Sequence, residues 1–456
     1  PGGSSMPFLH GFRRIIFEYQ PLVDEILGLL ALQDAARRSE LESPACLGSD
    51  RSQLSAVRRV LERETHSPFY QEGVSYALLK VTELGLVTAA EILLEFGADL
   101  SFEGTAAGKG GGGACGAAPF SKNHGVFLPP DPVTYYTPLH IAVLRNQPDV
   151  VELLVCHGAD INRRDRIHES SPLDLASEEP ERLSCLQRLL QLGADVNAAD
   201  KNGKTALLHA LASSDGVQIH NTESIRLLLE GGADVRATTK DGDTVFTSLI
   251  FLLGEGVCSS MEEARVTNGF CFRVAQLLLA HGANPSECPA PESLTHLCLS
   301  NFKHHFALLR FLLESGAAYN CCLHGPACWS GFQLVFECLC SHLSVSEEDS
   351  FYADLLQKGQ TLLELMMASS QAIRLPSNFE VNTSSCRYHG DKVRTLFCSL
   401  KQLEHTPQAL KHLCRVFIRQ RLKPWPVDVK IKALPLPDRL KWYLLIDHAA
   451  VGHEDL

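Results

Sequence analysis

A Leu-rich pattern with the period of an α-helix recurs along the chain, and each copy ends in a glycine. The copies are "AAEILLEFGADL" (89–100), "VVELLVCHGADI" (150–161), "CLQRLLQLGADV" (185–196), "SIRLLLEGGADV" (224–235), "VAQLLLAHGANP" (274–285) and "LLRFLLESGAAY" (308–319). Apolar residues three and four positions apart predict a helix with one buried face. Glycine takes the left-handed conformation that ends a helix without steric cost. The sequence therefore predicts a series of similar helices, each ended by its glycine.

The spacing of these glycines indicates a structural repeat. The glycines are Gly97, Gly158, Gly193, Gly232, Gly282 and Gly316, at intervals of 61, 35, 39, 50 and 34 residues. A first-helix pattern precedes several of them, in the copies "TPLHIA" (137–142), "SPLDLA" (171–176) and "TALLHA" (205–210), with weaker copies "SLTHLC" (293–298) and "SYALLK" (75–80). Two helices in a period near 33 residues are typical of ankyrin repeats. Residues 67–320 thus resemble the ankyrin-repeat family, with six recognisable units.

Helical patterns also lie on both sides of the repeats. Residues 1–66 are predicted to be an N-terminal helical region, and residues 321–398 a degenerate repeat with a helical connector. In that connector, "WSGFQLVFECLC" and "ADLLQKGQTLLELMMASS" both have helical periodicity. The long interval between Gly232 and Gly282 predicts an extended helix pair.

The 61-residue interval contains a Gly-rich segment without periodicity, residues 104–130. Removing its 27 residues leaves an interval of 34, so we expect a flexible insertion in an inter-repeat loop, or a misassigned intron. Its "GKGGGG" is not a phosphate-binding loop, because Lys109 is followed by Gly110 where that motif requires Ser or Thr.

Charge and composition exclude several classes of protein. The net charge of −12 makes a nucleic-acid partner unfavourable. No apolar run reaches the length of a membrane helix, so no membrane insertion is expected. Sixteen dispersed cysteines fit a reducing compartment, in which the thiols pack as small apolar groups. We therefore expect a cytoplasmic protein.

Candidate chemistry is sparse. The densest group of soft ligands is Cys321, Cys322, His324, Cys328, Cys338, Cys340 and His342, whose spacing is irregular for zinc. A second group, His140, His157, His209, His281 and His296, recurs in phase with the repeat, as scaffold residues do. We therefore expect no metal, no cofactor and no enzyme active site.

The C-terminal stretch "LKHLCRVFIRQRL" (410–422) predicts an amphipathic helix that stops at "KPWP". Its apolar face comprises Leu410, Leu413, Cys414, Phe417 and Ile418. "LPLP" (434–437) is expected to be extended and to present Leu434 and Leu436. Asp438 would then cap a last helix that buries Leu440, Tyr443 and Leu444. By periodicity alone, these helices are a cap on the last repeat.

Two short motifs give these helices a second interpretation. Ala409, Leu410, Cys414 and Ile418 match the elongin-binding box, and "LPLP" resembles the cullin-5 box that follows it. The chain therefore resembles the ankyrin-repeat and SOCS-box family over 67–320 and 399–445. That resemblance implies an all-α fold, an ankyrin-repeat solenoid followed by a small three-helix SOCS box at 399–456.

The same resemblance implies a function, that of a non-catalytic substrate receptor of an E3 ubiquitin ligase. Its partners would be elongin C with elongin B, cullin 5 with its ring-box protein, and an unidentified protein substrate sent to proteasomal degradation. The apolar face of 410–418 would bind elongin C, and Leu434, Pro435, Leu436 and Pro437 would bind cullin 5. The alternative is an ankyrin scaffold whose C-terminal helices only cap the array.

The loop tips between repeats offer a candidate surface for the substrate. They are unexpectedly basic for an acidic chain, with Arg163, Arg164, Arg166, Lys201, Lys204, Arg236 and Lys240. Arginine forks suit carboxylate and phosphate groups, so the surface could bind an acidic or phosphorylated segment. Interleaved aspartates leave open the alternative of ordinary solvated tips.

Overall fold

The computed structural model describes residues 19–30, 47–105, 135–166, 168–255, 260–286, 293–320, 330–343, 349–370, 375, 379–383, 389–422 and 427–445. These residues form helices and one pair of two-residue strands, which confirms the all-α prediction. The chain divides into two compact units, residues 1–201 and 202–456. None of the described helices is long and apolar enough to span a bilayer.

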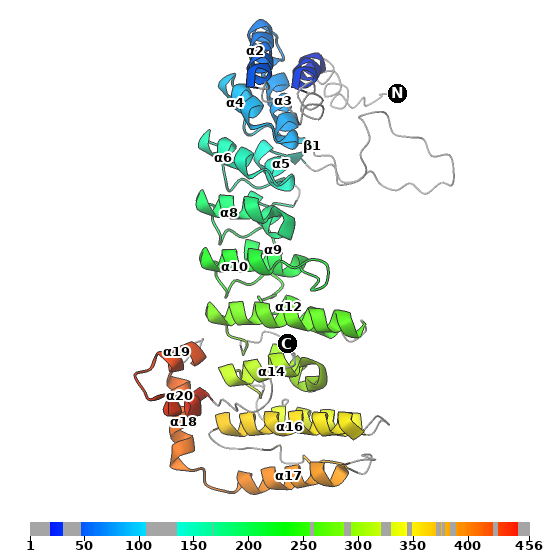
Figure 1. Ribbon diagram of the computed structural model, residues 1–456, viewed down its shortest axis with the longest axis vertical. Helices are drawn as coiled ribbons and strands as arrows, with labels where there is room; N and C mark the ends of the chain where they lie inside the picture. The colour runs from blue at the N-terminus through cyan, green and yellow to red at the C-terminus, as the bar shows by residue number, and fades with distance from the viewer. Residues whose placement is uncertain are drawn as a thin grey trace, which may run out of the picture. The chain divides into compact units, whose positions relative to one another are not determined.

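The first unit is a stack of helix pairs with the N-terminal helices at one end (Figure 1). Residues 19–30 are helical. The elements that follow are α2 (Leu47–Glu64), α3 (Tyr70–Leu84), α4 (Val87–Glu95), α5 (Pro138–Leu144), α6 (Pro148–Cys156), α7 (Pro172–Ser177), the 3₁₀ turn η1 (Pro180–Arg182) and α8 (Leu183–Gln191). First helices contact first helices, in the series α3, α5 and α7, and second helices contact second helices, in the series α4, α6 and α8.

The second unit continues the pairs and ends in four further helices (Figure 1). The pairs are α9 (Ala206–Ser213) with α10 (Thr222–Glu230), α11 (Thr247–Glu255) with α12 (Met261–Ala280), α13 (Leu294–Ser300) with α14 (Phe302–Ser315) and α15 (Gly331–Leu343) with α16 (Asp349–Ser369). The last helices are α17 (Gly390–Glu404), α18 (Leu410–Arg421), α19 (Val427–Ala433) and α20 (Asp438–Leu445). Helix α12 has 20 residues against nine in α10, which confirms the extended pair. Helices α15 and α16 confirm the two predicted in the connector.

The marker glycines end the helices as predicted. All six have φ between 85° and 96°, a left-handed conformation that residues with a Cβ rarely adopt. After Gly97, the amide of Ala98 donates to the Leu93 carbonyl at 3.0 Å, and Ala159 bonds Leu154 in the same way after Gly158. These bonds satisfy carbonyls at the helix end and reverse the chain toward the next repeat.

One of the recurring histidines joins two neighbouring repeats. The His140 ring is buried; its Nδ1 lies 2.7 Å from the Thr137 hydroxyl, and its Nε2 lies 3.3 Å from the Ser170 carbonyl oxygen in the next loop. Because the carbonyl can only accept, Nε2 carries the proton and Nδ1 accepts from Thr137. Burial lowers the pKa of His140, so the ring is neutral at physiological pH. The expected scaffold role is confirmed for His140.

Buried cysteines fill the core as small apolar groups. Burial raises the pKa of Cys185 and Cys271 to about 12 and that of Cys338 to about 11, so these thiols stay protonated. Cys298 is buried as well. Within the described residues, no group of His, Cys, Asp and Glu could hold a metal ion. Four members of the predicted soft-ligand group, 321, 322, 324 and 328, lie outside the described residues.

The ends of the Gly-rich insertion are paired. Strand β1 (Gly104–Thr105) runs antiparallel to β2 (Tyr135–Tyr136), and residues 106–134 between them lie outside the described residues. Gly104 is buried so close to Leu79 that a Cβ on the glycine would overlap the Leu79 side chain. The first two residues of the predicted insertion therefore belong to the repeat, which corrects its boundary from 104 to 106.

Replacing residues 106–134 by Asn-Gly should leave the melting temperature unchanged or slightly raised. Asn-Gly favours the tight turn that joins two antiparallel strands, so the pairing of β1 with β2 is kept. Deleting residues 104–130 should instead lower the melting temperature, because it removes Gly104 and its contact with Leu79. Thermal unfolding followed by circular dichroism compares the two variants. A lower melting temperature for the Asn-Gly variant would show that residues 106–134 pack on the repeats.

Candidate functional site: a C-terminal box with one exposed apolar face

The last three helices enclose a small apolar cluster of their own. Val427, Ile431 and Leu444 are buried at its centre. Side chains that are partly buried against them are Ile418, Leu422, Leu434, Leu436 and Leu445. The predicted amphipathic helix is confirmed as α18, and its capping residue Leu422 is the last described before residues 423–426. A cluster this small stabilises the three helices only weakly, so their position depends on contacts with neighbouring elements.

The inward face of α18 docks on the last repeats through a buried arginine. Arg419 is 5% exposed; its guanidinium donates to the Leu444 carbonyl of α20 at 2.7 Å and to the Glu314 carbonyl of α14. About two turns earlier, His412 Nε2 lies 2.6 Å from the carbonyl oxygen of Ser370, the residue after α16. Val416, 1% exposed, lies on the same face. These bonds hold α18 to both α14 and α16.

A tyrosine on α20 lies against two cations on α18. The Lys411 Nζ lies 4.2 Å from the Tyr443 ring centre, and the Arg415 guanidinium carbon lies 4.6 Å from it. Arg415 also donates to His412 Nδ1 at 3.0 Å, so His412 accepts at Nδ1 and donates at Nε2. Burial lowers the pKa of Arg415. The cation–π contacts add to the apolar cluster in joining α18 to α20.

The outward face of α18 is apolar and exposed, with the Arg421 guanidinium carbon 5.1 Å from the Phe417 ring centre. Leu410 is 76% exposed, Phe417 54% and Leu413 39%, and Cys414 is exposed beside them. Ile418, the fifth residue of the predicted elongin-binding face, packs instead on the cluster of the box. The helix therefore separates the predicted set into four residues directed outward and one that supports the box.

In "LPLP", the structure exposes the prolines and not the leucines that were predicted to be exposed. Leu434 and Leu436 are half-buried against the cluster, whereas Pro435 and Pro437 are exposed. The Leu436 amide donates to the Leu434 carbonyl at 2.8 Å, which closes a tight turn and directs both leucines inward. The expectation that the leucines are presented is wrong, because burying two leucines is favourable and the prolines can be left in water.

The last helix differs from its prediction at Asp438 and Leu440. Helix α20 begins at Asp438, so this residue lies in the first turn of the helix and not at the capping position before it. Leu444 is buried and Tyr443 is half-buried, as expected, but Leu440 is 47% exposed. Trp442, which the sequence analysis did not select, is 60% exposed on the same helix. The docking residues Arg419 and His412 were also missed. Their seven-residue spacing could have identified them, because it places two polar residues on the same helix face as Val416.

The three predicted arginines of the first basic tip are engaged in ion pairs. Arg163 and Arg166 both pair with Glu103, at 3.2 and 2.7 Å. Arg164 pairs with Asp174 at 3.1 Å. Lys201 belongs to the first unit, and both Lys201 and Lys204 have interaction partners. The remaining predicted residues of the second unit, Arg236 and Lys240, are exposed. An acidic target would therefore compete with carboxylates of the protein for the three arginines.

Comparison with known proteins agrees with this architecture. The SOCS box family matches residues 406–445, and ankyrin-repeat families match residues 134–166 and 173–219. Ankyrin helix pairs followed by such a box define the class, and the chain belongs to the ankyrin repeat and SOCS box family. It is 65% identical over 451 residues to ankyrin repeat and SOCS box protein 6 of Homo sapiens, covering 99% of this chain and 100% of that protein. It is 66% identical over 444 residues to the Mus musculus protein of that name, covering 97% and 99%.

Replacing Arg419 by Met should loosen the box from the repeats. The substitution keeps an apolar stem but leaves the Leu444 and Glu314 carbonyls without the guanidinium. Hydrogen bonds to a charged group contribute about 1.5–3 kcal/mol each, so we expect a loss of at least about 2 kcal/mol in the opening free energy of α20. Amide hydrogen exchange measures that loss, with Arg439→Met on the exposed side of α20 as the control. Equal protection of α20 in the two variants would contradict the docking role.

Proposed function

We propose that the chain is the substrate-recognition subunit of a cullin-5 E3 ubiquitin ligase, joined to the ligase by elongin B and elongin C. In this proposal, the protein directs a bound target to ubiquitylation and proteasomal degradation. Membership of the ankyrin repeat and SOCS box family supports a substrate receptor in general. The observation that carries the specific proposal is the exposed apolar face of α18, on a helix whose opposite face is fully used.

The exposed face has the chemistry of a helix that fills a groove in a partner. Leu410, Leu413, Cys414 and Phe417 lie within two turns of one another and form one stripe. Leaving such a stripe in water is unfavourable, since each buried side chain of this size contributes about 1.5–3 kcal/mol. Helix-in-groove recognition uses anchors at this spacing. We infer that Leu410 and Phe417 are the anchors and that the Cys414 thiol packs beside them as a small apolar group.

The exposed prolines supply a second, separate contact. Pro435 and Pro437 lie in the turn between α19 and α20, outside α18. Each proline follows a leucine, Leu434 or Leu436, whose side chain packs on the cluster of the box and so holds the turn in place. We propose that the two prolines contact cullin 5, whereas the two leucines act only by holding the turn.

The proposed mechanism is proximity rather than chemistry by this chain. A ligase brings an activated ubiquitin to its receptor, and the receptor raises the effective concentration of target lysines near it. That gain is greatest when the two ends of the receptor are held at a defined distance. The bonds of Arg419 and His412 to the last repeats support such a fixed arrangement within the second unit.

An ankyrin scaffold with a C-terminal cap is the alternative, and one observation favours it. The inward face of α18 covers the last repeats through contacts with α16. A cap, however, needs only that inward face and gives no reason for Leu410 and Phe417 to face outward. Binding of elongins therefore separates the two functions.

Changing Leu410 and Phe417 together to Ala should weaken binding of the elongin B–elongin C heterodimer by more than about 30-fold. Truncation of an interface anchor costs about 2 kcal/mol or more, and two anchors are removed. Isothermal titration calorimetry with the recombinant heterodimer measures the change in Kd.

The matched control is Leu84→Ala with Phe251→Ala, because these two side chains are similarly exposed, at 58% and 65%, but lie far from α18 in the sequence. Both variants should keep the wild-type melting temperature, since no buried contact is lost. Unchanged elongin affinity for the α18 variant would leave the cap as the function of the box.

Changing Pro435 and Pro437 to Ala should weaken cullin-5 binding by at least about tenfold and leave elongin binding within about twofold. Changing Leu434 and Leu436 to Ala should instead lower the stability of the box and affect both partners, because the leucines belong to the cluster. Pull-down with a purified N-terminal fragment of cullin 5, in the presence of elongins, compares the variants. A loss of both partners in the proline variant would disprove this division between the two contacts.

A further inference from the structure

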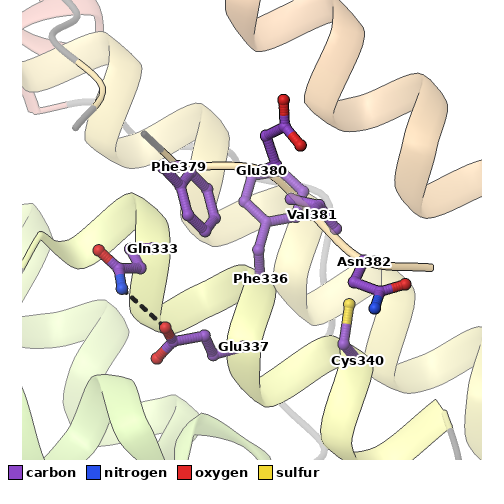
Figure 2. A pocket seen from close by; sticks show the side chains of 8 residues that line it. All are labelled: Gln333, Phe336, Glu337, Cys340, Phe379, Glu380, Val381 and Asn382. Atoms are coloured by element: carbon purple, nitrogen blue, oxygen red, sulfur yellow. Dashed lines mark hydrogen bonds between the residues drawn. The ribbon is translucent and has the colours of Figure 1, made fainter. Parts of the chain in front are cut away.

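A pocket of about 570 Å³ lies between α15 and the described segment 379–383, away from the C-terminal box. Figure 2 shows its lining side chains, with Phe336 and Phe379 between the carboxylates of Glu337 and Glu380. The carboxylates are both exposed, so the pocket opens to solvent. Nothing in the proposed ligase function uses it.

Aromatic packing makes the wall of this pocket rigid. The Phe336 ring is 1% exposed and meets Phe397 of α17 edge-on, at 5.5 Å between ring centres. Phe379 lies 6.2 Å from Phe336 and 5.5 Å from Phe397, so three rings hold the segment against the helices. The far end of the segment is fixed as well, because Arg394 donates to the Thr383 hydroxyl at 2.9 Å. A wall held at both ends is a preorganised surface.

The two charged groups of the pocket, Glu337 and Glu380, are both negative. Gln333 donates to one carboxylate oxygen of Glu337 at 2.7 Å, which orients the group without neutralising it. Among the described residues, neither Glu337 nor Glu380 lies in an ion pair with a lysine or arginine. This contrasts with the basic tips of the first unit, where the arginines are paired with carboxylates.

We propose that this pocket binds an arginine side chain of a basic segment in a partner protein. The planar guanidinium stacks on an aromatic ring and donates two parallel bonds to a carboxylate, and the pocket offers both kinds of group. An acidic segment would be repelled by the two carboxylates. A neutral apolar segment would remove them from water without compensation. The proposal does not depend on elongin or cullin binding.

The test measures binding of a capped Gly-Arg-Arg-Gly peptide to the full chain. The uncharged control is the capped Gly-citrulline-citrulline-Gly peptide. Citrulline keeps the shape of arginine but carries no charge. Saturation-transfer NMR at millimolar peptide should show protein contact at the arginine methylene protons, and titration should give an affinity at least about tenfold higher than for the citrulline peptide.

Variants then locate the binding. E337Q with E380Q should reduce arginine-peptide affinity at least about tenfold, and Phe379→Ala should weaken it as well. The matched control is E364Q with E91Q, because Glu364 accepts from Gln360 at 2.9 Å in the same i, i+4 arrangement, and Glu91 is exposed. The control should bind as the wild type does. Equal affinity for the two peptides, no binding by the wild type, or undiminished binding by E337Q with E380Q would overturn the proposal.

Discussion

Within each compact unit, the helix pairs bury their apolar faces against one another and against the neighbouring pairs, and the placement of the loops and of the C-terminal helices depends on that constraint. A repeat cannot be stable alone, so the stack must continue until an element covers its last apolar surface. Left-handed glycines such as Gly97 and Gly158 set the direction of each return, and His140 ties one loop to the next. At the C-terminal end, α17 covers α15 and α18 covers α16. Helix α18 is therefore needed for the structure of the last repeats, independently of any binding role.

Helix α18 covers the last repeats with one face, and its other face is exposed to solvent. His412 and Arg419 bond to the last repeats and α20, and Val416 is buried beside them, whereas Leu410 and Phe417 face water. A buried arginine is costly unless its donors are satisfied, and here backbone carbonyls of two different helices accept from it. Because the two acceptors belong to α20 and α14, the side of α18 that carries Arg419 has to face these helices. The bonds of Arg419 and His412 therefore favour the rotation in which Leu410 and Phe417 face outward.

The sequence predicted elements and their ends better than it predicted which faces are covered. Periodicity and glycine spacing are local signals, and they located the helix pairs, the long α12 and the amphipathic α18. Which face of a helix is buried depends on its tertiary partners, and periodicity does not identify those partners. By periodicity, the Leu410 stripe is the core face of α18, yet the structure buries the face with Val416 and Arg419. The outward stripe was assigned correctly to exposure only through the motif resemblance, and the elongin contact itself stays a prediction.

The errors have the same origin. Leu434 and Leu436 were expected outside because "LPLP" cannot be helical, but a tight turn returns both leucines to the cluster. Ile418 was grouped with Leu410 because the two are eight residues apart, although it packs against the cluster of Val427, Ile431 and Leu444. The basic tips were treated as free because Glu103 lies 60 residues before Arg163 in the sequence. None of these partners could be recognised without the fold.

Charge distribution bears on the kind of target that the receptor accepts. Residues 406–445 contain nine Lys and Arg against two Asp and Glu, so this basic box is joined to a remainder far more acidic than the net charge of −12 indicates. An acidic remainder raises the local concentration of basic segments and repels acidic ones, over distances of about 8–10 Å at physiological salt. The arginines of the first basic tip, which could have attracted an acidic segment, are paired with Glu103 and Asp174. By contrast, Glu337 and Glu380 have no basic partner among the described residues. Both observations favour a target that is basic where it meets the repeats and the connector. The initial interpretation of the arginine tips as a site for an acidic segment would require that target to displace two carboxylates against the field of the whole unit.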